Sequence, residues 1–176
     1  MLYTLKSGIL YQEPNYRELV KIKGSLVGPA KQIYKGDKEF LLKSDIRYLD
    51  ETKVHSGDVR NKEYILMDSD GKIVCKGLPG YADGDDPDVV GWPICRMPRV
   101  DHAKIAIGGA DYLLVMYNSQ NYGLQDRQGK EILRILHKGI SGGWKIDCDS
   151  DFTPEVLCGL FAFCRYIEQE NEFLIV

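Results

Sequence analysis

The side chains that could act as nucleophiles or metal ligands are few, and they are widely spaced along the chain. The cysteines are Cys75, Cys95, Cys148, Cys158 and Cys164. Their number is odd and none belongs to a C-x-x-C pair, which argues against a disulfide framework and against a structural zinc site. Free thiols in a reducing compartment are the simplest interpretation, so we expect a cytoplasmic protein.

Histidine chemistry is equally sparse. The histidines are His55, His102 and His137, and none lies in a nucleophile motif such as G-x-S-x-G. Asp101 and His102 are adjacent and could form an acid–base couple, but neighbouring residues of a strand point to opposite faces. We therefore predict no catalytic residue and no cofactor. A hydrolase-like enzyme whose pocket carries no known motif is the alternative.

Four carboxylates in the six residues Asp83-Gly84-Asp85-Asp86-Pro87-Asp88 could offer hard oxygen ligands to Ca²⁺. This loop lacks the twelve-residue spacing and the terminal Glu of an EF-hand. Asp68-Ser69-Asp70-Gly71 starts like such a loop, but the twelfth position falls on Pro79. We predict solvated turns in both places and no metal site, with a bound cation at Asp83–Asp88 left open.

Basic side chains form two groupings that could contact a phosphate. The first consists of Lys35, Lys38 and Lys43, and the second of Arg127, Lys130, Arg134 and Lys138. Either could bind a lipid headgroup, or be charge that only solubilises the surface. No phosphate-binding glycine loop accompanies them. Because 23 Lys and Arg stand against 26 Asp and Glu, the net charge of −3 gives no general attraction to nucleic acid.

The elements that must position these residues are mostly short strands. Candidate strands bounded by Gly, Asp, Asn and Pro are 3–5, 9–11, 19–22, 25–27, 39–42, 46–49, 64–67, 73–76, 89–92, 104–107, 112–117, 122–125, 131–136 and 144–148. Trp144, Ile146 and Cys148 alternate with Lys145 and Asp147, as expected of a strand with one buried face. With 176 residues, of which 44% are hydrophobic, we expect one domain spanning 1–176.

One hairpin pattern occurs twice. Tyr64–Val74 and Tyr122–Ile132 share Y-x-L-x-D-x-x-G-K-x-[VI]. The Asp side chain can bond to the turn backbone, and Gly71 and Gly129 supply the positive φ that such turns require. We interpret the two segments as equivalent hairpins, the alternative being two unrelated turns with the same chemistry.

The C-terminal segment predicts a helix of a different kind. Thr153 is a typical N-cap and Pro154 a typical first residue. Over Val156–Ile167 only Arg165 is polar, so the helix must be buried on all sides, yet it is too short to span a bilayer. We predict a helix at about 154–168, with Arg165 at its mouth-side end and Glu168–Glu172 returning to solvent. The residues expected to be almost inaccessible are Leu157, Leu160, Phe161 and Cys164.

A helix buried all round in a mainly β chain predicts a closed antiparallel β-barrel around it. The sequence here resembles the tubby C-terminal-like superfamily, which includes tubby proteins, phospholipid scramblases and LURP-one-related proteins. The resemblance rests on the two D-x-x-G-K hairpins, on Gly142–Ile146 leading into Asp151–Pro154, and on the apolar helix. It implies a barrel of about 12 strands around a hydrophobic C-terminal helix.

The resemblance also carries an expectation of function. It implies a non-enzymatic binding or scaffold domain, with an anionic phospholipid headgroup or a protein as partner. Tubby proteins bind phosphoinositides, and in this sequence the weak candidates for such a contact are Arg127, Lys130, Arg134 and Lys138. No transmembrane segment is expected, because no run of 18 apolar residues occurs.

Overall fold

Twelve antiparallel strands follow one another around a closed ring, and each pairs with its neighbours in the sequence. Pairing of β1 with β12 closes the ring, with Tyr3 opposite Ile146. The computed structural model describes residues 1–24, 28–36, 39–88 and 98–172. A closed ring has no edge strand, so every strand has a hydrogen-bonded neighbour on each side.

The bounds of the strands follow the turn signals in the sequence. They are β1 (Leu2–Lys6), β2 (Ile9–Gln12), β3 (Arg17–Gly24), β4 (Lys31–Lys35), β5 (Glu39–Tyr48), β6 (Lys62–Met67), β7 (Ile73–Tyr81), β8 (Val100–Ile107), β9 (Ala110–Asn118), β10 (Asn121–Gln125), β11 (Glu131–His137) and β12 (Trp144–Cys148). Short 3₁₀ helices lie at η1 (Glu51–Ser56), η2 (Val59–Asn61) and η3 (Gly139–Ser141). One α-helix, α1 (Pro154–Glu172), follows β12.

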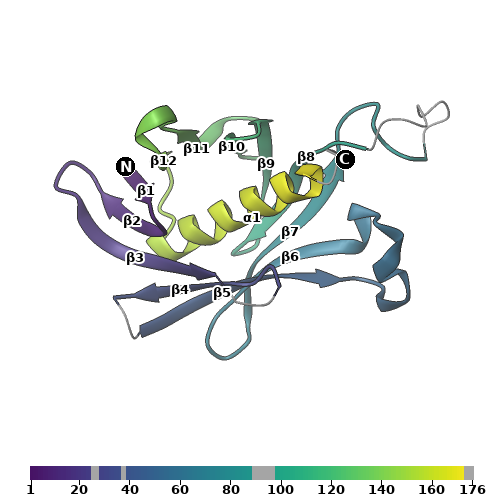
Figure 1. Ribbon diagram of the computed structural model, residues 1–176, viewed down its shortest axis with the longest axis horizontal. Helices are drawn as coiled ribbons and strands as arrows, with labels where there is room; N and C mark the ends of the chain where they lie inside the picture. The colour runs from purple at the N-terminus through teal and green to yellow at the C-terminus, as the bar shows by residue number, and fades with distance from the viewer. Residues whose placement is uncertain (25–27, 37–38, 89–97, 173–176) are drawn as a thin grey trace.

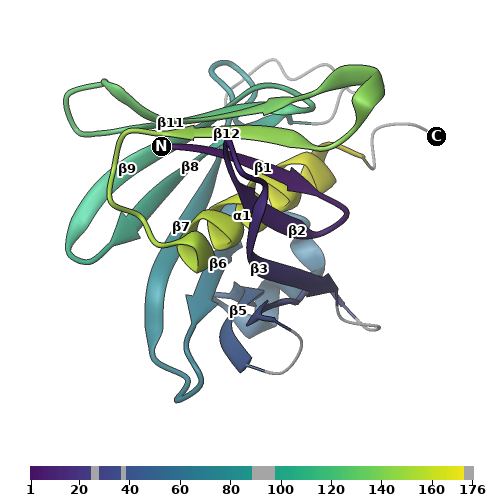
Figure 2. The same cartoon turned by 90° about the vertical axis from the view of Figure 1, so that its left-hand side faces the viewer.

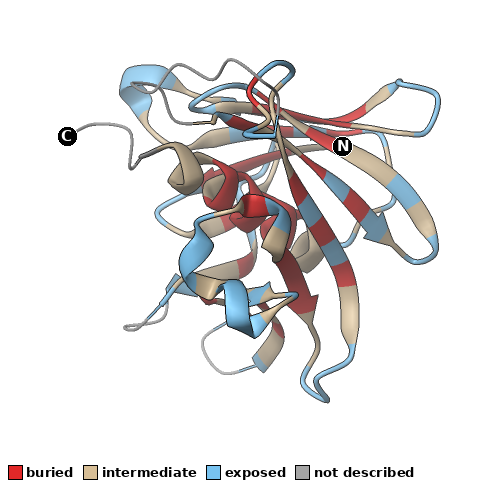
Figure 3. Ribbon diagram, turned by 90° about the vertical axis from the view of Figure 1, so that its right-hand side faces the viewer, coloured by how far each residue is buried: buried red, intermediate tan, exposed pale blue. Residues whose placement is uncertain are grey.

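Inward and outward side chains alternate along the strands, as Figure 3 shows by the change between buried and exposed residues. On β12, Ile146 and Cys148 are buried while Lys145 and Asp147 are exposed, as the sequence pattern predicts. The uniformly apolar segment of β9 is not covered on both faces. Leu114 and Met116 point into the core, whereas Tyr117 on the outer face is 47% exposed.

The two hairpins with the repeated pattern have the same turn geometry. In each, the aspartate side chain accepts hydrogen bonds from the backbone N–H groups two and four residues later, which are those of Asp70 and Lys72 in one hairpin and of Gln128 and Lys130 in the other. Gly71 has φ 78° and Gly129 has φ 77°, the left-handed region that favours glycine. The prediction of equivalent hairpins is confirmed in this geometry.

Helix α1 lies inside the barrel, with strands on opposite sides of it in both views (Figure 1 and Figure 2). Leu157, Leu160 and Cys164 are fully buried and Phe161 is 9% exposed, as predicted. The carbonyl of Thr153 accepts from the Leu157 N–H, which starts the helix where the sequence indicates. Enclosure of these side chains removes apolar surface from water at about 25 cal/mol per Å².

The predicted end of the helix is wrong. The helix does not stop at about 168 but continues through Glu172, and its acidic end is tied to the barrel mouth. Lys62 of β6 donates to Glu170 at 2.6 Å, and the Asn171 amide exchanges hydrogen bonds of 3.0 and 2.8 Å with the backbone of Val100. Arg165 pairs with Glu168, as expected for a charge near the mouth.

Four predicted strands need correction or lie outside the described residues, and one strand was missed. The segments 39–42 and 46–49 belong to one continuous strand, β5. Strand β4 was not predicted, because it begins with the polar residues Lys31 and Gln32 and has only a short apolar pattern. The candidate strands 25–27 and 89–92 lie outside the described residues, as do Lys38, Trp92 and Cys95.

Candidate functional site

A large hollow lies on the outer face of the barrel, whereas side chains of α1 pack in the interior. It crosses β7, β8, β9 and β10 and has a volume of about 630 Å³. We call it the β7–β10 groove. Its lining residues are Glu63, Lys76, Leu78, Lys104, Ile105, Ala106, Asp111, Tyr112, Leu113, Gln125, Asp126, Arg127 and Gly129.

Strand register explains why these residues meet. Leu78 of β7 lies opposite Lys104 of β8, and Lys104 in turn lies opposite Leu113 of β9. The neighbouring row places Ala106 opposite Lys76 on one side and Asp111 on the other. Since Ala106 has a shorter side chain than Lys76 and Asp111, it leaves a depression between them, next to the row of Leu78, Lys104 and Leu113.

Charges of both signs surround the apolar floor. Lys76 lies 3.5 Å from Glu63, and Arg127 lies 2.5 Å from Asp111. Lys104 is exposed, and within the described part of the chain its ammonium group has no ion-pair partner. The groove therefore contains one cation that is free to meet an incoming acidic group.

The four basic residues predicted for lipid binding do not converge. Arg127 lies at the β10–β11 turn, and Lys130 follows it at the start of β11. Arg134 lies four residues further along that strand, about 13 Å away at the usual rise per residue. Lys138 follows the far end of β11 and donates to the Thr4 hydroxyl at 3.3 Å.

Acidic neighbours also offset two of these four charges. Arg127 pairs with Asp111, as described above. Arg134 donates to Glu131 at 2.6 Å, and both line a small hollow of about 170 Å³ together with Asp147 and Asp149. A phosphate beside Arg134 would meet three carboxylates. In the other predicted grouping, Lys43 pairs with Asp45 at 2.8 Å, whereas Lys35 is at the end of β4.

The prediction that Asp101 and His102 point apart is wrong. The Asp101 Oδ1 and His102 Nδ1 atoms are 2.7 Å apart on β8. The register between β7 and β8 is irregular here, with Gly80 opposite His102 and Tyr81 opposite Val100, so strict alternation fails. The imidazole lies against Gly80, where a Cβ would come within 2.3 Å of His102 Nε2.

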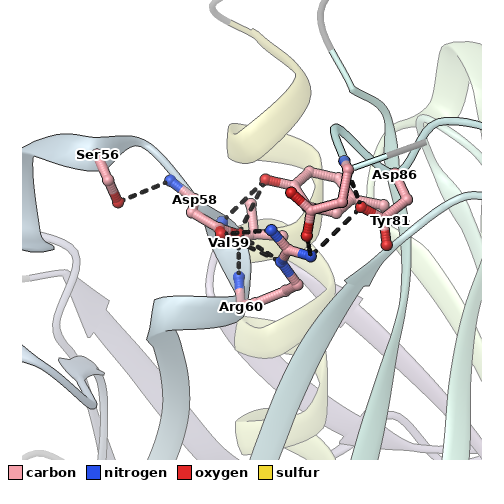
Figure 4. A network of polar contacts seen from close by, with 7 residues as sticks. Ser56, Asp58, Val59, Arg60, Tyr81 and Asp86 are labelled. Carbon is pink, nitrogen blue, oxygen red and sulfur yellow. Dashed lines mark hydrogen bonds and ion pairs between the residues drawn. The ribbon is translucent and has the colours of Figure 1, made fainter. Parts of the chain in front are cut away.

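Carboxylates of the acidic loop bind an arginine (Figure 4). Arg60 of η2 contacts Asp58 at 2.8 Å, Asp88 at 2.6 Å and Asp86 at 3.3 Å. The hydrogen bonds from Arg60 lower the pKa of the Asp58 carboxyl. This loop is therefore not the simple solvated turn that the sequence predicts.

Asp85 departs furthest from that prediction. It is 6% exposed and accepts from the Arg99 backbone N–H at 3.1 Å. Within the described ranges, no group of three or more His, Cys, Asp or Glu residues has an arrangement that could hold a metal ion.

The described cysteines are buried thiols. Cys158 and Cys164 are fully buried in α1, and Cys75 is 1% exposed on β7. Burial raises the pKa of the Cys75 thiol to about 12 and raises the pKa of both helix thiols well above the ordinary value. A neutral, enclosed thiol is a poor nucleophile.

Comparison of the chain with protein-family models, with curated proteins and with solved structures gives no match. Over the described residues, no helix combines the length and the apolar character needed to cross a membrane.

Proposed function

We propose that this chain is a non-enzymatic binding module that holds its partner in the β7–β10 groove. The observation that carries the proposal is that the interior of the barrel is occupied, whereas its outer face is hollowed. Helix α1 packs in the interior, and a large hollow is open on the outer face, lined by apolar and charged side chains. A concave apolar surface with a few polar groups is the usual form of a binding site.

The side chains with catalytic potential favour binding over hydrolysis. The described thiols are enclosed, and among the described residues no hydroxyl or thiol contacts the Asp101–His102 couple. A general base needs a nucleophile or a substrate proton within hydrogen-bond reach. The groove offers leucines, an alanine and charged rim groups, which suit recognition.

An anionic phospholipid surface, which the tubby resemblance implies, is supported less well by the charge distribution. Arg127 and Arg134 each lie beside a carboxylate, and Lys130 and Lys138 are at opposite ends of β11. The groove contains Glu63, Asp111 and Asp126 beside its three cations, so it offers no excess of positive charge to an anionic bilayer. The geometry therefore favours a partner that presents both apolar and polar side chains.

A neutral apolar probe tests whether the groove is the binding surface. We expect N-phenylnaphthylamine, titrated into isotope-labelled protein, to shift backbone amide signals of β7, β8, β9 and β10. Leu113→Glu should abolish the shifts, because it places a charge on the floor. Ile140→Glu is the matched control, since Ile140 is fully exposed on η3, outside the groove. Shifts elsewhere on the barrel, or shifts that persist in Leu113→Glu, would refute the proposal.

A further inference from the structure

We propose that the partner of the β7–β10 groove is an acidic, apolar segment of another protein, recognised through Lys104. This inference rests on the proposed function and specifies its partner. The segment would place one apolar side chain over Ala106, next to the row in which Lys104 lies between Leu78 and Leu113, and a carboxylate against the Lys104 ammonium group.

The shape of the floor supports an apolar anchor. Leu78 is 43% exposed, although it lies in the middle of β7 with Lys104 opposite it. Ala106 lies two residues from Lys104 on the same face of β8, and its methyl group leaves room that longer side chains would fill. An apolar side chain that covers these atoms would remove exposed leucine surface from water. Apolar anchors in pockets of this kind dominate the affinity of protein interfaces.

The charges specify an acidic neighbour for that anchor. Lys76 lies 3.5 Å from Glu63, which also accepts from Arg47, and Arg127 pairs with Asp111, so both cations have a carboxylate neighbour. Lys104 has none within the described residues. A partner that covered Lys104 without a carboxylate would remove the ammonium group from water uncompensated, which is costly. A matched carboxylate would therefore provide specificity at the centre of the groove.

The rim favours a protein over a bilayer or a single-headed amphiphile. The groove presents leucine and alanine side chains beside charges of both signs, and protein interfaces likewise combine apolar with polar contacts. Since the ring of strands is closed, it offers the segment no edge strand, so we expect recognition through side chains.

A second hollow continues the groove and gives the segment room to extend. It has a volume of about 350 Å³ and shares Leu78 and Lys104 with the groove. Arg60, Asp86 and His102 line its far side. A chain anchored over Ala106 would thus pass Lys104 before it reached a region of both charges.

Selection of random peptides displayed on phage tests the inference. On the full chain we expect enrichment of Asp or Glu next to Leu, Ile, Met or Phe. A synthetic copy of an enriched peptide should bind Lys104→Glu at least roughly tenfold more weakly, bind Lys104→Arg nearly as well as the parent, and keep its affinity for Lys145→Glu. Lys145 is the matched control, an exposed outward lysine on β12.

Three results would overturn the inference. The first is no enrichment, the second is enrichment without an acidic residue, and the third is displacement of the peptide by phosphatidylserine vesicles but not by phosphatidylcholine vesicles. If the neutral probe still maps to the groove while any of these occurs, only the partner assignment fails. If the probe maps elsewhere, the groove itself fails as the binding surface.

Discussion

At the scale of single residues, the core contains two buried tyrosines that are in contact and differ in the hydrogen bonding of their hydroxyl groups. The rings of Tyr64 and Tyr166 are 5.3 Å apart, and both side chains are fully buried. The Tyr166 hydroxyl donates to the Pro29 carbonyl at 3.0 Å and lies 2.9 Å from the Ser44 hydroxyl. The Tyr64 hydroxyl has no hydrogen-bond partner in the described structure.

Removing the two hydroxyls should have opposite effects. Tyr166→Phe should lower the free energy of unfolding by about 1–3 kcal/mol, because it leaves the buried Ser44 hydroxyl and the Pro29 carbonyl without their partner. Tyr64→Phe should leave stability unchanged or raise it, because it deletes a buried polar atom that bonds to nothing. Urea unfolding of both variants measures the difference. An equal loss in the two would show that the Tyr64 hydroxyl has a partner after all.

The groove residues show what a sequence cannot reveal at this scale. Lys104 and Leu113 are ordinary strand residues in the sequence, and nothing in their spacing relates them. They meet because β8 and β9 pair in one register, which is a property of the folded sheet. Arg127 and Arg134 appeared to form a basic grouping because the partner of Arg127, Asp111, is distant in sequence, and because the pairing of Arg134 with nearby Glu131 was not considered.

At the scale of elements, the contact between α1 and β6 depends on a glycine. A Cβ at Gly159 would lie 2.5 Å from one methyl carbon of Leu66 and 3.1 Å from its Cγ. Leu66 is fully buried and cannot swing into solvent. The helix therefore gives up the propensity that alanine would supply at this position in order to approach the strand closely.

Gly159→Ala should lower the free energy of unfolding by about 1–3 kcal/mol through overpacking, despite its better helix propensity. Leu66→Ala alone should cost about 2–5 kcal/mol as a cavity. The double variant should cost less than the sum, because the new methyl group occupies part of that cavity. Chemical denaturation of the three variants gives the coupling. A stabilising Gly159→Ala would mean that the helix can move away from β6.

The acidic loop is tied to η2 through Arg60, and this contact should depend on pH. The Asp58 pKa is lowered from its ordinary value of 3.8, chiefly by the hydrogen bonds from Arg60. A carboxyl group with a lowered pKa in the folded state stabilises the fold above its unfolded pKa and loses that contribution as the pH falls through the folded value.

Stability should therefore decline below pH 3.8, and part of the decline should disappear in Arg60→Gln. The urea midpoint across a series from neutral to acidic pH measures both effects. Arg134→Gln, which removes an exposed ion pair on β11, is the control. In this variant the urea midpoint should change with pH as steeply as it does in the parent. If the urea midpoint of Arg60→Gln falls with decreasing pH as steeply as that of the parent, the Arg60 contacts do not determine the loss of stability in acid.

Element positions were predictable where one chain segment carried the whole signal. The start of α1 follows from Thr153 and Pro154, and the two hairpin turns follow from their Asp and Gly residues. The end of α1 was not predictable, because Glu170 and Asn171 are held by Lys62 and Val100 from distant strands. Turn chemistry is local, whereas the capture of a helix end by a barrel mouth is not.

At the scale of the whole molecule, the closed barrel followed from one argument about burial. A helix that is apolar on every side needs enclosure, and a chain of short strands can provide it only by closing around the helix. Function did not follow in the same way. Packing in the interior determines the fold. Side chains on the outer face, such as Leu78 and Lys104, take no part in that packing, so the burial argument does not predict what they bind.

Enclosure also predicts how the molecule opens. Cys158 and Cys164 belong to α1 and Cys75 belongs to β7, and all three side chains lie in the same core. In a Cys95→Ser background, we expect a disulfide-exchange reagent to label these three thiols at one common rate, which rises with urea as steeply as global unfolding does. The reason is geometric: α1 packs against β3 through β9, so it cannot leave while those strands stay paired.

Mass spectrometry of the labelled peptides measures each rate separately. Faster labelling of the helix thiols than of Cys75 would mean that α1 can withdraw through the barrel mouth, in spite of the contacts of Glu170 and Asn171 that hold it there.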